Sequence, residues 1–273
     1  MTQPIEPIRC TVGILTFNSR AVLQRVLEST EEFGERIICD GGSTDGTREL
    51  ARSRGCVVLE QQPEFQRSDG SLCDFAGAMN QLLDAATEQW FFKVDSDEMP
   101  SPELTRELRE ALAAQPDVDG YSIPLKYVVN GAVIENASTY PMRQVRVVRS
   151  GGKARYTGSV HEGFGDPDLV IESLGAPHLL PQWPIWTLIR RWSRYLRIEL
   201  REYAEQPLSV RWRTGARRHA KGARYLARRA VAVRREELRP YLPLRYEVLR
   251  VAHHVVATAV IIGLPVVRRR LAA

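Results

Sequence analysis

Two acidic segments, each placed directly after an apolar run, are the residues of this chain best suited to do chemistry. Asp40 follows the run 36–39, and Asp95-Ser96-Asp97 follows the run 90–94. Ligands of open α/β folds bind beyond the carboxyl ends of the strands, where such carboxylates would lie. Because Mg²⁺ and Mn²⁺ bind one or two carboxylates together with substrate phosphate oxygens, the two segments predict one site for a nucleotide and a divalent cation.

Each segment also has a purely structural interpretation. In an extended chain the first and third residues of Asp95-Ser96-Asp97 project to one side, as a cation site requires, but the same triplet can form a solvated acidic turn. Asp40 precedes Gly41-Gly42, and its side chain can accept nearby backbone amides in an Asx-turn instead of contacting a nucleotide base. The sequence leaves both alternatives open.

Strand and helix patterns alternate at short intervals around these segments. The strand patterns cover residues 9–17, 36–39, 56–60 and 90–94, and the helix patterns cover 20–32, 47–54, 74–88 and 102–114. Near-continuous apolar strands separated by helices are typical of a parallel sheet with right-handed crossovers. Alternating runs follow around 121–123, 127–129, 132–134 and 144–148, and Asn130-Gly131 predicts a hairpin between two of them. We therefore expect an α/β fold with a mixed, mostly parallel sheet flanked by helices.

Charge is divided unevenly along the 273 residues. Residues 1–182 contain 17 Lys and Arg against 27 Asp and Glu, whereas residues 183–273 contain 21 Lys and Arg against 6 Asp and Glu. This split predicts a domain over 1–182 and a basic, α-helical appendage over 183–273, which face different partners. The four cysteines form no CxxC pair, and residues 1–9 include no apolar signal-peptide core. We therefore expect a reduced, cytoplasmic protein.

Three segments taken together resemble the family 2 glycosyltransferases, which have a GT-A (Rossmann-like) fold. They are GILTFN at 13–18, CDGGSTDGT at 39–47 and VDSDE at 94–98, in the order and spacing of that family. The resemblance covers about residues 9–180. It implies transfer of a sugar from a nucleoside diphosphate sugar with the aid of Mg²⁺ or Mn²⁺. The chain is similar to subfamilies that act on lipopolysaccharide-core-like acceptors.

The resemblance also implies a role for each residue that matches. A metal at this place would stabilise the negative charge that grows on the leaving diphosphate. By the resemblance, Asp40 would contact the base, Asp95 the ribose and Asp97 the metal. Thr16 and Asn18 would lie beside the nucleotide, and Arg67 would contact the base or a phosphate.

A general base must deprotonate the acceptor hydroxyl. Similar subfamilies carry Val-His-Glu at the place of 160–162, so Glu162 would be the base of an inverting displacement and His161 would orient it or touch phosphate. A surface turn is the alternative for this pair. The Glu-Asp base motif of many family members is missing, and residues 190–192 (RRW) differ from the QxxRW of processive polymerases. We therefore expect transfer of a single sugar.

Two further residues match the family outside these motifs. His178 follows a strand pattern, where related sequences often have a histidine, and would complete the metal shell or contact phosphate. A structural histidine is the alternative for this position. Asn80 matches an asparagine common before the strand that ends at Asp95, and we expect it to position a loop.

The basic region 183–273 is predicted to form amphipathic helices with apolar and arginine faces. Nucleic acid would match its charge, but no nucleic-acid motif is present and the acidic first domain would be repelled. A structural cap on the catalytic domain is a second possibility. Interfacial helices on anionic lipid fit best, because they combine Trp, Tyr and aliphatic faces with basic faces. Residues 251–267 are mostly apolar but shorter than the roughly 20 residues that span a bilayer, so the sequence allows them to span it or lie on it.

Together these features predict an inverting, metal-dependent glycosyltransferase, peripheral on the inner face of the cell membrane. It would move one sugar from a nucleoside diphosphate sugar to a hydroxyl of a cell-envelope glycan or glycolipid. A sugar-nucleotide nucleotidyltransferase is an alternative, although the chain lacks the Gly-rich N-terminal loop with Arg and Lys of that group. The second alternative is a non-catalytic membrane-surface adaptor, which needs only the basic region.

Overall fold

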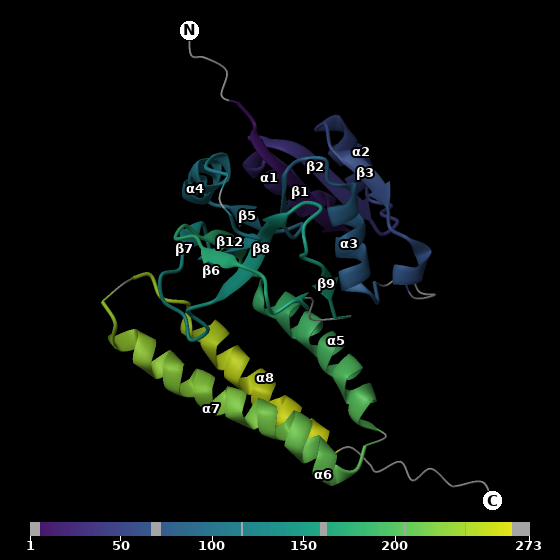
Figure 1. The fold of residues 1–273 in the computed structure, drawn as a ribbon. Coiled ribbons are helices and arrows are strands. Elements are labelled where there is room, and N and C mark those ends of the chain that lie inside the picture. The colour runs from purple at the N-terminus through teal and green to yellow at the C-terminus, as the bar shows by residue number, and fades with distance from the viewer. Residues whose placement is uncertain are drawn as a thin grey trace, which may run out of the picture. The chain divides into compact units, whose positions relative to one another are not determined.

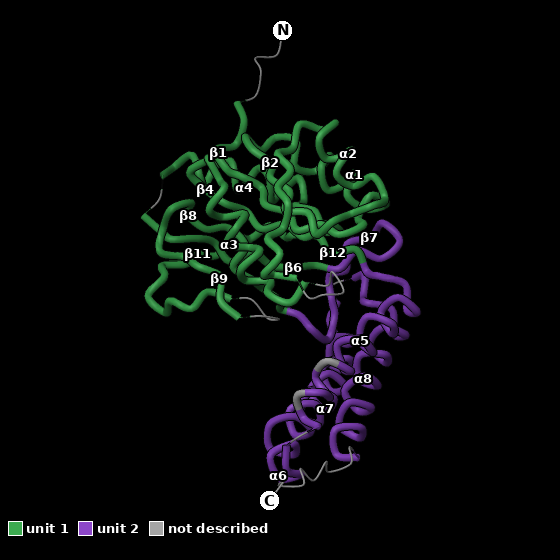
Figure 2. The backbone as a smooth tube through the Cα atoms, turned by 90° about the vertical axis from the view of Figure 1, so that its right-hand side faces the viewer, with its two compact units in different colours: residues 1–126, 141–181 green, residues 127–140, 182–273 purple. Residues whose placement is uncertain are grey.

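A computed structural model describes residues 6–66, 72–115, 117–158, 163–204, 206–237 and 239–263 of the chain. The chain divides into two compact units, shown in Figure 2. The sheet unit comprises Met1–Lys126 and Pro141–Pro181, and the helical unit comprises Tyr127–Tyr140 and Gln182–Ala273. The second unit begins at Gln182, where the charge changes, but it also includes residues 127–140, which the charge pattern places with the first domain.

Buried polar contacts explain why this segment belongs to the helical unit. The backbone amide of Ser138 donates to Glu247 Oε1 at 2.8 Å, its hydroxyl donates to Glu247 Oε2, and Glu247 is 1% exposed. Arg229 donates to the carbonyl of Tyr140 at 3.0 Å. A buried carboxylate is stable only when it is hydrogen-bonded, so Glu247 ties the segment to its own helix. Sequence patterns could not show this, because the partners are about a hundred residues apart.

The sheet unit is built on a mixed sheet (Figure 1). The strands of this sheet run in the order β3-β2-β1-β4-β8-β6-β12-β5, with β7 and β11 paired to β6. The strand β7 lies within residues 127–140 and so belongs to the helical unit. The strand bounds are β1 Ile8–Thr16, β2 Phe33–Asp40, β3 Val57–Glu60, β4 Trp90–Lys93, β5 Met99–Pro100, β6 Gly120–Val129, β7 Ala132–Val133, β8 Arg143–Arg149, β11 Ile171–Ser173 and β12 His178–Pro181, and a separate pair is formed by β9 Tyr156–Thr157 and β10 Gly163–Phe164. The first four strands are parallel and β8 joins them antiparallel, so the expected α/β fold with a mixed sheet is confirmed.

Helices cover both faces of this sheet. Their bounds are α1 Arg20–Ser29, α2 Thr47–Ser53, the 3₁₀ turn η1 Pro63–Phe65, α3 Phe75–Ala85 and α4 Pro102–Ala113. Apolar side chains of α1, α2 and α4 pack in one core cluster with β1 and β4, whereas α3 packs in a second cluster with Phe91 and Tyr156. The nearly continuous apolar strands are explained by this cover, because both of their faces are buried.

The predicted hairpin is present between β6 and β7. Val128 pairs with Val133 and Val129 with Ala132, so Asn130 and Gly131 form its turn. Their φ angles are 50° and 80°. Positive φ at both central residues is what a two-residue turn between right-twisted strands requires, and Asn-Gly adopts it at low cost.

The helical unit consists of α5 Ile185–Ala204, α6 Leu208–Arg211, the π-helical turn η2 Trp212–Ala216, α7 Arg217–Ala232, the 3₁₀ turn η3 Val233–Arg235 and α8 Leu244–Gly263. The helices α7 and α8 lie side by side in both views, and α8 also contacts α5 and η2. Leu188 of α5 and Ala223 and Leu226 of α7 are buried. The apolar stripes expected on α5 and α7 therefore contribute to packing inside this unit.

One described helix, α8, is long and apolar enough to cross a membrane by length and composition. Its mean hydropathy is 1.2 over the most apolar window, a fifth of which is buried. Length and composition of a single helix are weak evidence for a span, since helices in protein cores meet the same criteria.

Gly13 of β1 is required because the ring of Phe91, from the neighbouring strand β4, packs directly against it. A Cβ at this position would lie 2.3 Å from Cζ of Phe91, whose ring is fully buried, and 3.5 Å from Cβ of Leu82. We expect Gly13→Ala to lower the free energy of unfolding by about 1–3 kcal/mol, measured by urea denaturation, because the ring has no room to move. The control is Gly163→Ala, where a Cβ meets nothing within 4 Å. Equal stability of the two variants would contradict this account of Gly13.

Candidate active site

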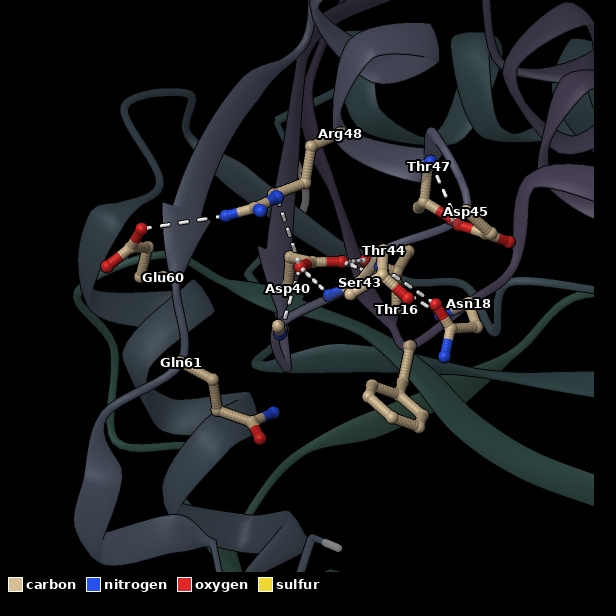
Figure 3. A network of polar contacts seen from close by, with 12 residues as sticks. Thr16, Asn18, Asp40, Ser43, Thr44, Asp45, Thr47, Arg48, Glu60 and Gln61 are labelled. Atoms are coloured by element: carbon tan, nitrogen blue, oxygen red, sulfur yellow. Dashed lines mark hydrogen bonds and ion pairs between the residues drawn. The ribbon is translucent and has the colours of Figure 1, made fainter. Parts of the chain in front are cut away.

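The carboxyl ends of β1 and β2 meet at Thr16 and Asp40, which are partners in the parallel register. Asp40 is 2% exposed. Its Oδ1 accepts hydrogen bonds from the hydroxyls of Thr16 at 2.8 Å and Ser43 at 2.5 Å, and its Oδ2 accepts the backbone amides of Gly42 at 3.0 Å and Ser43 at 2.7 Å. Figure 3 shows this network. Asp40 therefore forms the Asx-turn that the sequence allows as an alternative to a base contact.

These bonds limit what else Asp40 can do. A carboxylate has about four acceptor positions, and four hydrogen bonds within the protein engage them. The guanidinium of Arg48 also approaches Oδ2, with Nε at 3.8 Å. A contact from Asp40 to a nucleotide base must therefore replace one of these bonds, and that contact stays a proposal.

The loop after β1 is fastened to the loop after β2 by backbone-to-side-chain bonds. The amide of Asn18 donates to Ser43 Oγ at 2.8 Å, and the amide of Thr44 donates to Asn18 Oδ1 at 2.9 Å. The amide of Ser19 donates to Thr47 Oγ1 at 2.9 Å. Asn18 has a φ of 49°, a left-handed conformation that asparagine tolerates better than most residues. The motifs at 13–18 and 39–47 thus form one rigid rim, in which Asn18 holds the turn.

Phe17 presents an aromatic ring at this rim. Its side chain is 58% exposed although it follows a strand buried almost throughout. A Cβ placed on Gly41 would lie 3.5 Å from Cδ2 of Phe17, so the ring lies beside the glycine that follows Asp40. The sequence interpretation assigned Phe17 no role. The signal that could have found it is a large aromatic residue at the exposed end of a buried strand.

The rim continues to the segment after β4. Ser19 Oγ donates to Ser96 Oγ at 3.2 Å, which joins the β1 loop to Asp95-Ser96-Asp97. The two acidic segments recognised in the sequence therefore lie at one edge of the sheet. Adjacency of β2, β1 and β4 explains this, since their carboxyl ends meet at the same edge.

A buried arginine from β8 organises the acidic segment. Arg146 is 2% exposed, with Nη1 at 3.1 Å from Asp95 Oδ2 and Nη2 at 2.9 Å from Glu98 Oε2. The planar guanidinium suits this two-pronged binding of carboxylates. Neither Arg146 nor Glu98 was given a role from the sequence, and a lone arginine in an alternating strand provides no signal for one.

The two carboxyl groups that Arg146 binds have pKa values shifted in opposite directions. Burial would raise the pKa of Asp95, but the Arg146 and Lys93 charges outweigh it and hold that pKa well below its usual range. Burial and the Asp95 charge raise the pKa of Glu98 to about 8. At neutral pH the cluster therefore holds Asp95 as a carboxylate and Glu98 mainly as an acid, which leaves the Arg146 charge balanced.

His178 lies next to this cluster at the start of β12. It is fully buried, its Nε2 lies 3.3 Å from Glu98 Oε2, and its ring packs edge-on against Phe92. Burial and the Arg146 charge hold the pKa of His178 well below its usual value, so the imidazole is neutral. Both ring nitrogens lack a hydrogen-bond partner within the described part of the chain. A neutral imidazole with an unused ring nitrogen is able to bind a metal.

The donor set suits a cation that shares its ligands with a substrate. No three His, Cys, Asp or Glu side chains among the described residues are arranged to hold a metal ion by themselves. Asp97 is half-buried and close enough to His178 to raise its pKa. Mg²⁺ and Mn²⁺ sites completed by phosphate oxygens use only one or two protein carboxylates. Asp97 and His178 thus fit the metal that the sequence implies.

The remaining residues predicted from the sequence are Arg67, Asn80, His161 and Glu162. Arg67, His161 and Glu162 lie outside the described residues. Asn80 of α3 donates to the carbonyl of Tyr156 at 3.0 Å and accepts its amide at 3.0 Å, so it holds β9 against α3. The positioning role expected for Asn80 is thereby confirmed.

The sequence pattern of glycosyl transferase family 2 matches residues 11–164, more than half of the chain. This chain therefore belongs to glycosyl transferase family 2. The matched segment includes the rim formed by β1, β2 and β4 and the buried Arg146.

Individual relatives agree with this family assignment. A lipopolysaccharide core biosynthesis glycosyltransferase, LpsC of Rhizobium meliloti, is 31% identical over 162 residues, which cover 59% of this chain and 58% of LpsC. The SPbeta prophage-derived glycosyltransferase SunS of Bacillus subtilis is 26% identical over 56% of this chain and 34% of SunS. The match thus spans little more than half of LpsC and a third of SunS. A crystal structure of glucosyl-3-phosphoglycerate synthase from Mycobacterium tuberculosis is 18% identical with a TM-score of 0.47, covering 66% of this chain and 74% of that one.

Arg146 provides the charge that keeps the acidic segment folded. We expect Arg146→Met to lower the free energy of unfolding by about 1–3 kcal/mol, because it leaves the partly buried carboxyl groups of Asp95 and Glu98 without their hydrogen-bonding partner. Arg146→Lys should recover part of this loss, since it keeps the charge but not the fork. Urea denaturation of the three proteins measures the difference.

The matched control is Arg155→Met, which removes an exposed ion pair with Asp84 in the same unit. Exposed pairs contribute about 0–1 kcal/mol, so this variant should unfold near the wild-type urea concentration. If Arg146→Met did the same, the proposed dependence on Arg146 would be wrong.

Proposed function

We propose that this chain is an inverting, metal-dependent glycosyltransferase that moves one sugar from a nucleoside diphosphate sugar to an acceptor hydroxyl. The observation that carries the proposal is the single rim at the carboxyl ends of β1, β2 and β4, where Ser19 and Ser96 join the turn of Asp40 to the segment of Asp97. In open α/β sheets this edge binds ligands, and family 2 membership makes a sugar nucleotide the expected one.

The donor nucleotide would bind along this rim. The exposed ring of Phe17 offers a face on which a base can stack, and Asp40 beside it can accept a base N–H in exchange for one of its internal bonds. Asp95, oriented by Arg146, would accept hydrogen bonds from the ribose. Thr16 and Asn18 support this subsite by fixing Asp40 and its turn. Arg67 is kept as a further base or phosphate contact on its place in the sequence.

Asp97 and His178 would hold the divalent cation, Mg²⁺ or Mn²⁺, together with the diphosphate. When bound, the cation neutralises the negative charge that develops on the leaving nucleoside diphosphate. Arg146 keeps Asp95 and Glu98 in place beside this position and contributes a fixed positive charge.

Glu162 would act as the general base, with His161 orienting it or touching phosphate. Inversion needs one carboxylate on the face of the sugar opposite the leaving group, and this base takes the proton of the acceptor hydroxyl as the bond to the sugar forms. This assignment rests on the sequence pattern at 160–162.

The acceptor would be a cell-envelope glycan or glycolipid, reached from the inner face of the cell membrane. The relative LpsC is named for lipopolysaccharide core biosynthesis, which supports an acceptor of that class. The helical unit, with its excess of arginine, would bring the enzyme to anionic lipid.

Calorimetric titration with UDP, GDP and dTDP, each with and without Mn²⁺, tests the donor site. We expect metal-dependent binding of one nucleotide and its reduction by at least about tenfold in Asp97→Ala, because the cation then loses a charged ligand. The control is Asp117→Ala, an exposed aspartate outside the site. Unchanged Mn²⁺-dependent affinity in Asp97→Ala would remove Asp97 from the metal site, and no binding of any nucleotide would reject the donor site itself.

Glu162→Gln separates binding from chemistry. We expect donor affinity to stay at the wild-type value while turnover, measured as nucleotide released in the presence of acceptor, falls by about 10²–10⁴-fold, as loss of a general base predicts. The exposed Glu172 of β11 offers a matched control through Glu172→Gln. Wild-type turnover in Glu162→Gln would assign the base to another group.

A further inference from the structure

The helix α8 packs on its unit through polar as well as apolar side chains, since Tyr246, Ala257 and Ile261 are buried as well as Glu247. Its inward face carries polar side chains: Glu247 accepts from Ser138, Arg250 donates to Gln182 at 3.1 Å, and His254 Nδ1 lies 2.9 Å from His219 Nδ1. Arg250 also lies over the ring of Tyr127, with 4.7 Å to its centroid. Polar groups with partners therefore share the inward side of α8 with the buried apolar residues Ala257 and Ile261.

The outward side of α8 carries an apolar stripe, beside which Arg245 is also exposed. Leu244, Val248, Val255 and Ile262 are 60%, 57%, 54% and 40% exposed. Together with Ala252 and Ala259 they recur at intervals of three or four residues, which places them on one side of a helix. We call these six residues the outer stripe, and it extends roughly 27 Å at the usual rise per residue.

Neighbouring helices expose mainly basic side chains, with single aromatic residues such as Trp186 of α5 and Tyr225 of α7 among them. The exposed face of α7 carries Arg217, Arg218, Lys221, Arg224 and Arg228, and the exposed face of α5 carries Arg190, Arg191, Arg194, Arg197 and Arg201. Within the described part of the helical unit, α8 is thus the helix that turns an apolar stripe outward beside basic helices. A long apolar stripe rimmed by cations is the surface that binds at a lipid–water boundary.

We infer that α8 lies in the plane of an anionic membrane surface, with the outer stripe at the boundary between head groups and acyl chains. This inference rests on the membrane association proposed above and identifies the element responsible for it. Arginines of α5 and α7 would attract the anionic head groups, and the stripe would supply the apolar contact.

A membrane-spanning α8 conflicts with its inward face. A span would carry Glu247 and Arg250 into hydrocarbon, where ionised side chains are costly, unless the helices that partner them followed. Those helices expose a row of arginines, so their transfer would cost still more. The in-plane arrangement leaves Glu247 and Arg250 with their partners inside the unit and keeps the exposed arginines in water or among head groups.

A second copy of the chain is a poorer partner for the outer stripe than lipid. Pairing of two stripes would bring together two helical units that each carry an excess of about fourteen positive charges, since each has 21 Lys and Arg against 7 Asp and Glu. Anionic lipid complements the same charge. The charge therefore favours a membrane over self-association.

Flotation of the purified full chain with vesicles tests the inference. Wild type should float with vesicles that contain phosphatidylglycerol and much less with phosphatidylcholine alone. The double variant Val248→Gln/Val255→Gln should lose on the order of tenfold or more in partitioning, because two apolar contacts with lipid are removed without a change of charge. The control is Val170→Gln, an equally exposed valine in the sheet unit, 55% exposed, which should float as wild type does.

Each result separates one part of the proposal from another. Unchanged partitioning of the double variant would overturn the role of α8 while leaving membrane association standing, and no flotation of wild type would overturn membrane association itself.

Retention of wild type on vesicles through an alkaline carbonate wash would show a span and overturn the in-plane arrangement. A dimer in sedimentation without lipid, lost in the double variant, would assign the stripe to self-association. Nucleotide binding measured on the same samples reports on the transferase proposal separately, and circular dichroism shows that the variants are folded.

Discussion

The acidic edge of the sheet depends on one buried guanidinium. Arg146 comes from an antiparallel strand that follows the parallel part of the sheet, and it binds a carboxyl group on each side of Asp97. Without that guanidinium, Asp95 and Glu98 would both lose the group that holds their side chains in place. Because the guanidinium balances them, the segment keeps Asp97 close to His178, where a cation and a diphosphate can share ligands.

The nucleotide side of the same edge is held by hydrogen bonds instead of ion pairs. Asp40 is surrounded by hydroxyls and amides, and Asn18 and Ser19 tie the next loop to the same turn. Such a network fixes the rim before a ligand arrives, which lowers the entropy cost of binding. The network also gives Asp40 a structural role in addition to the proposed contact with the base, so the turn and the proposed donor subsite would depend on the same carboxylate.

The helical unit is shaped by its high content of arginine. Its helices carry too many arginines to bury, and α8 places its polar groups inward, where Glu247, Arg250 and His254 find partners. Apart from Arg245, the exposed positions of α8 carry no charge, whereas Ala257 and Ile261 pack inward. This arrangement is unfavourable in water and favourable at a lipid surface, which links the unit to a glycosyltransferase whose proposed acceptor belongs to the cell envelope.

Periodicity and motif chemistry in the sequence were sufficient for the α/β class, the strand and helix positions, the Asn130-Gly131 hairpin and the family, because each depends on residues close together in the chain. Tertiary structure decided the features that depend on distant partners. These are the hydrogen bonds of Asp40, the ion pairs of Arg146 and the exposure of the Phe17 ring. Residues 127–140 belong to the helical unit for the same reason, because Ser138 is bonded to Glu247. The direction in which α8 faces belongs to the second group. The sequence shows which residues of a helix are apolar, but the partners that bind its polar side chains decide which face is exposed.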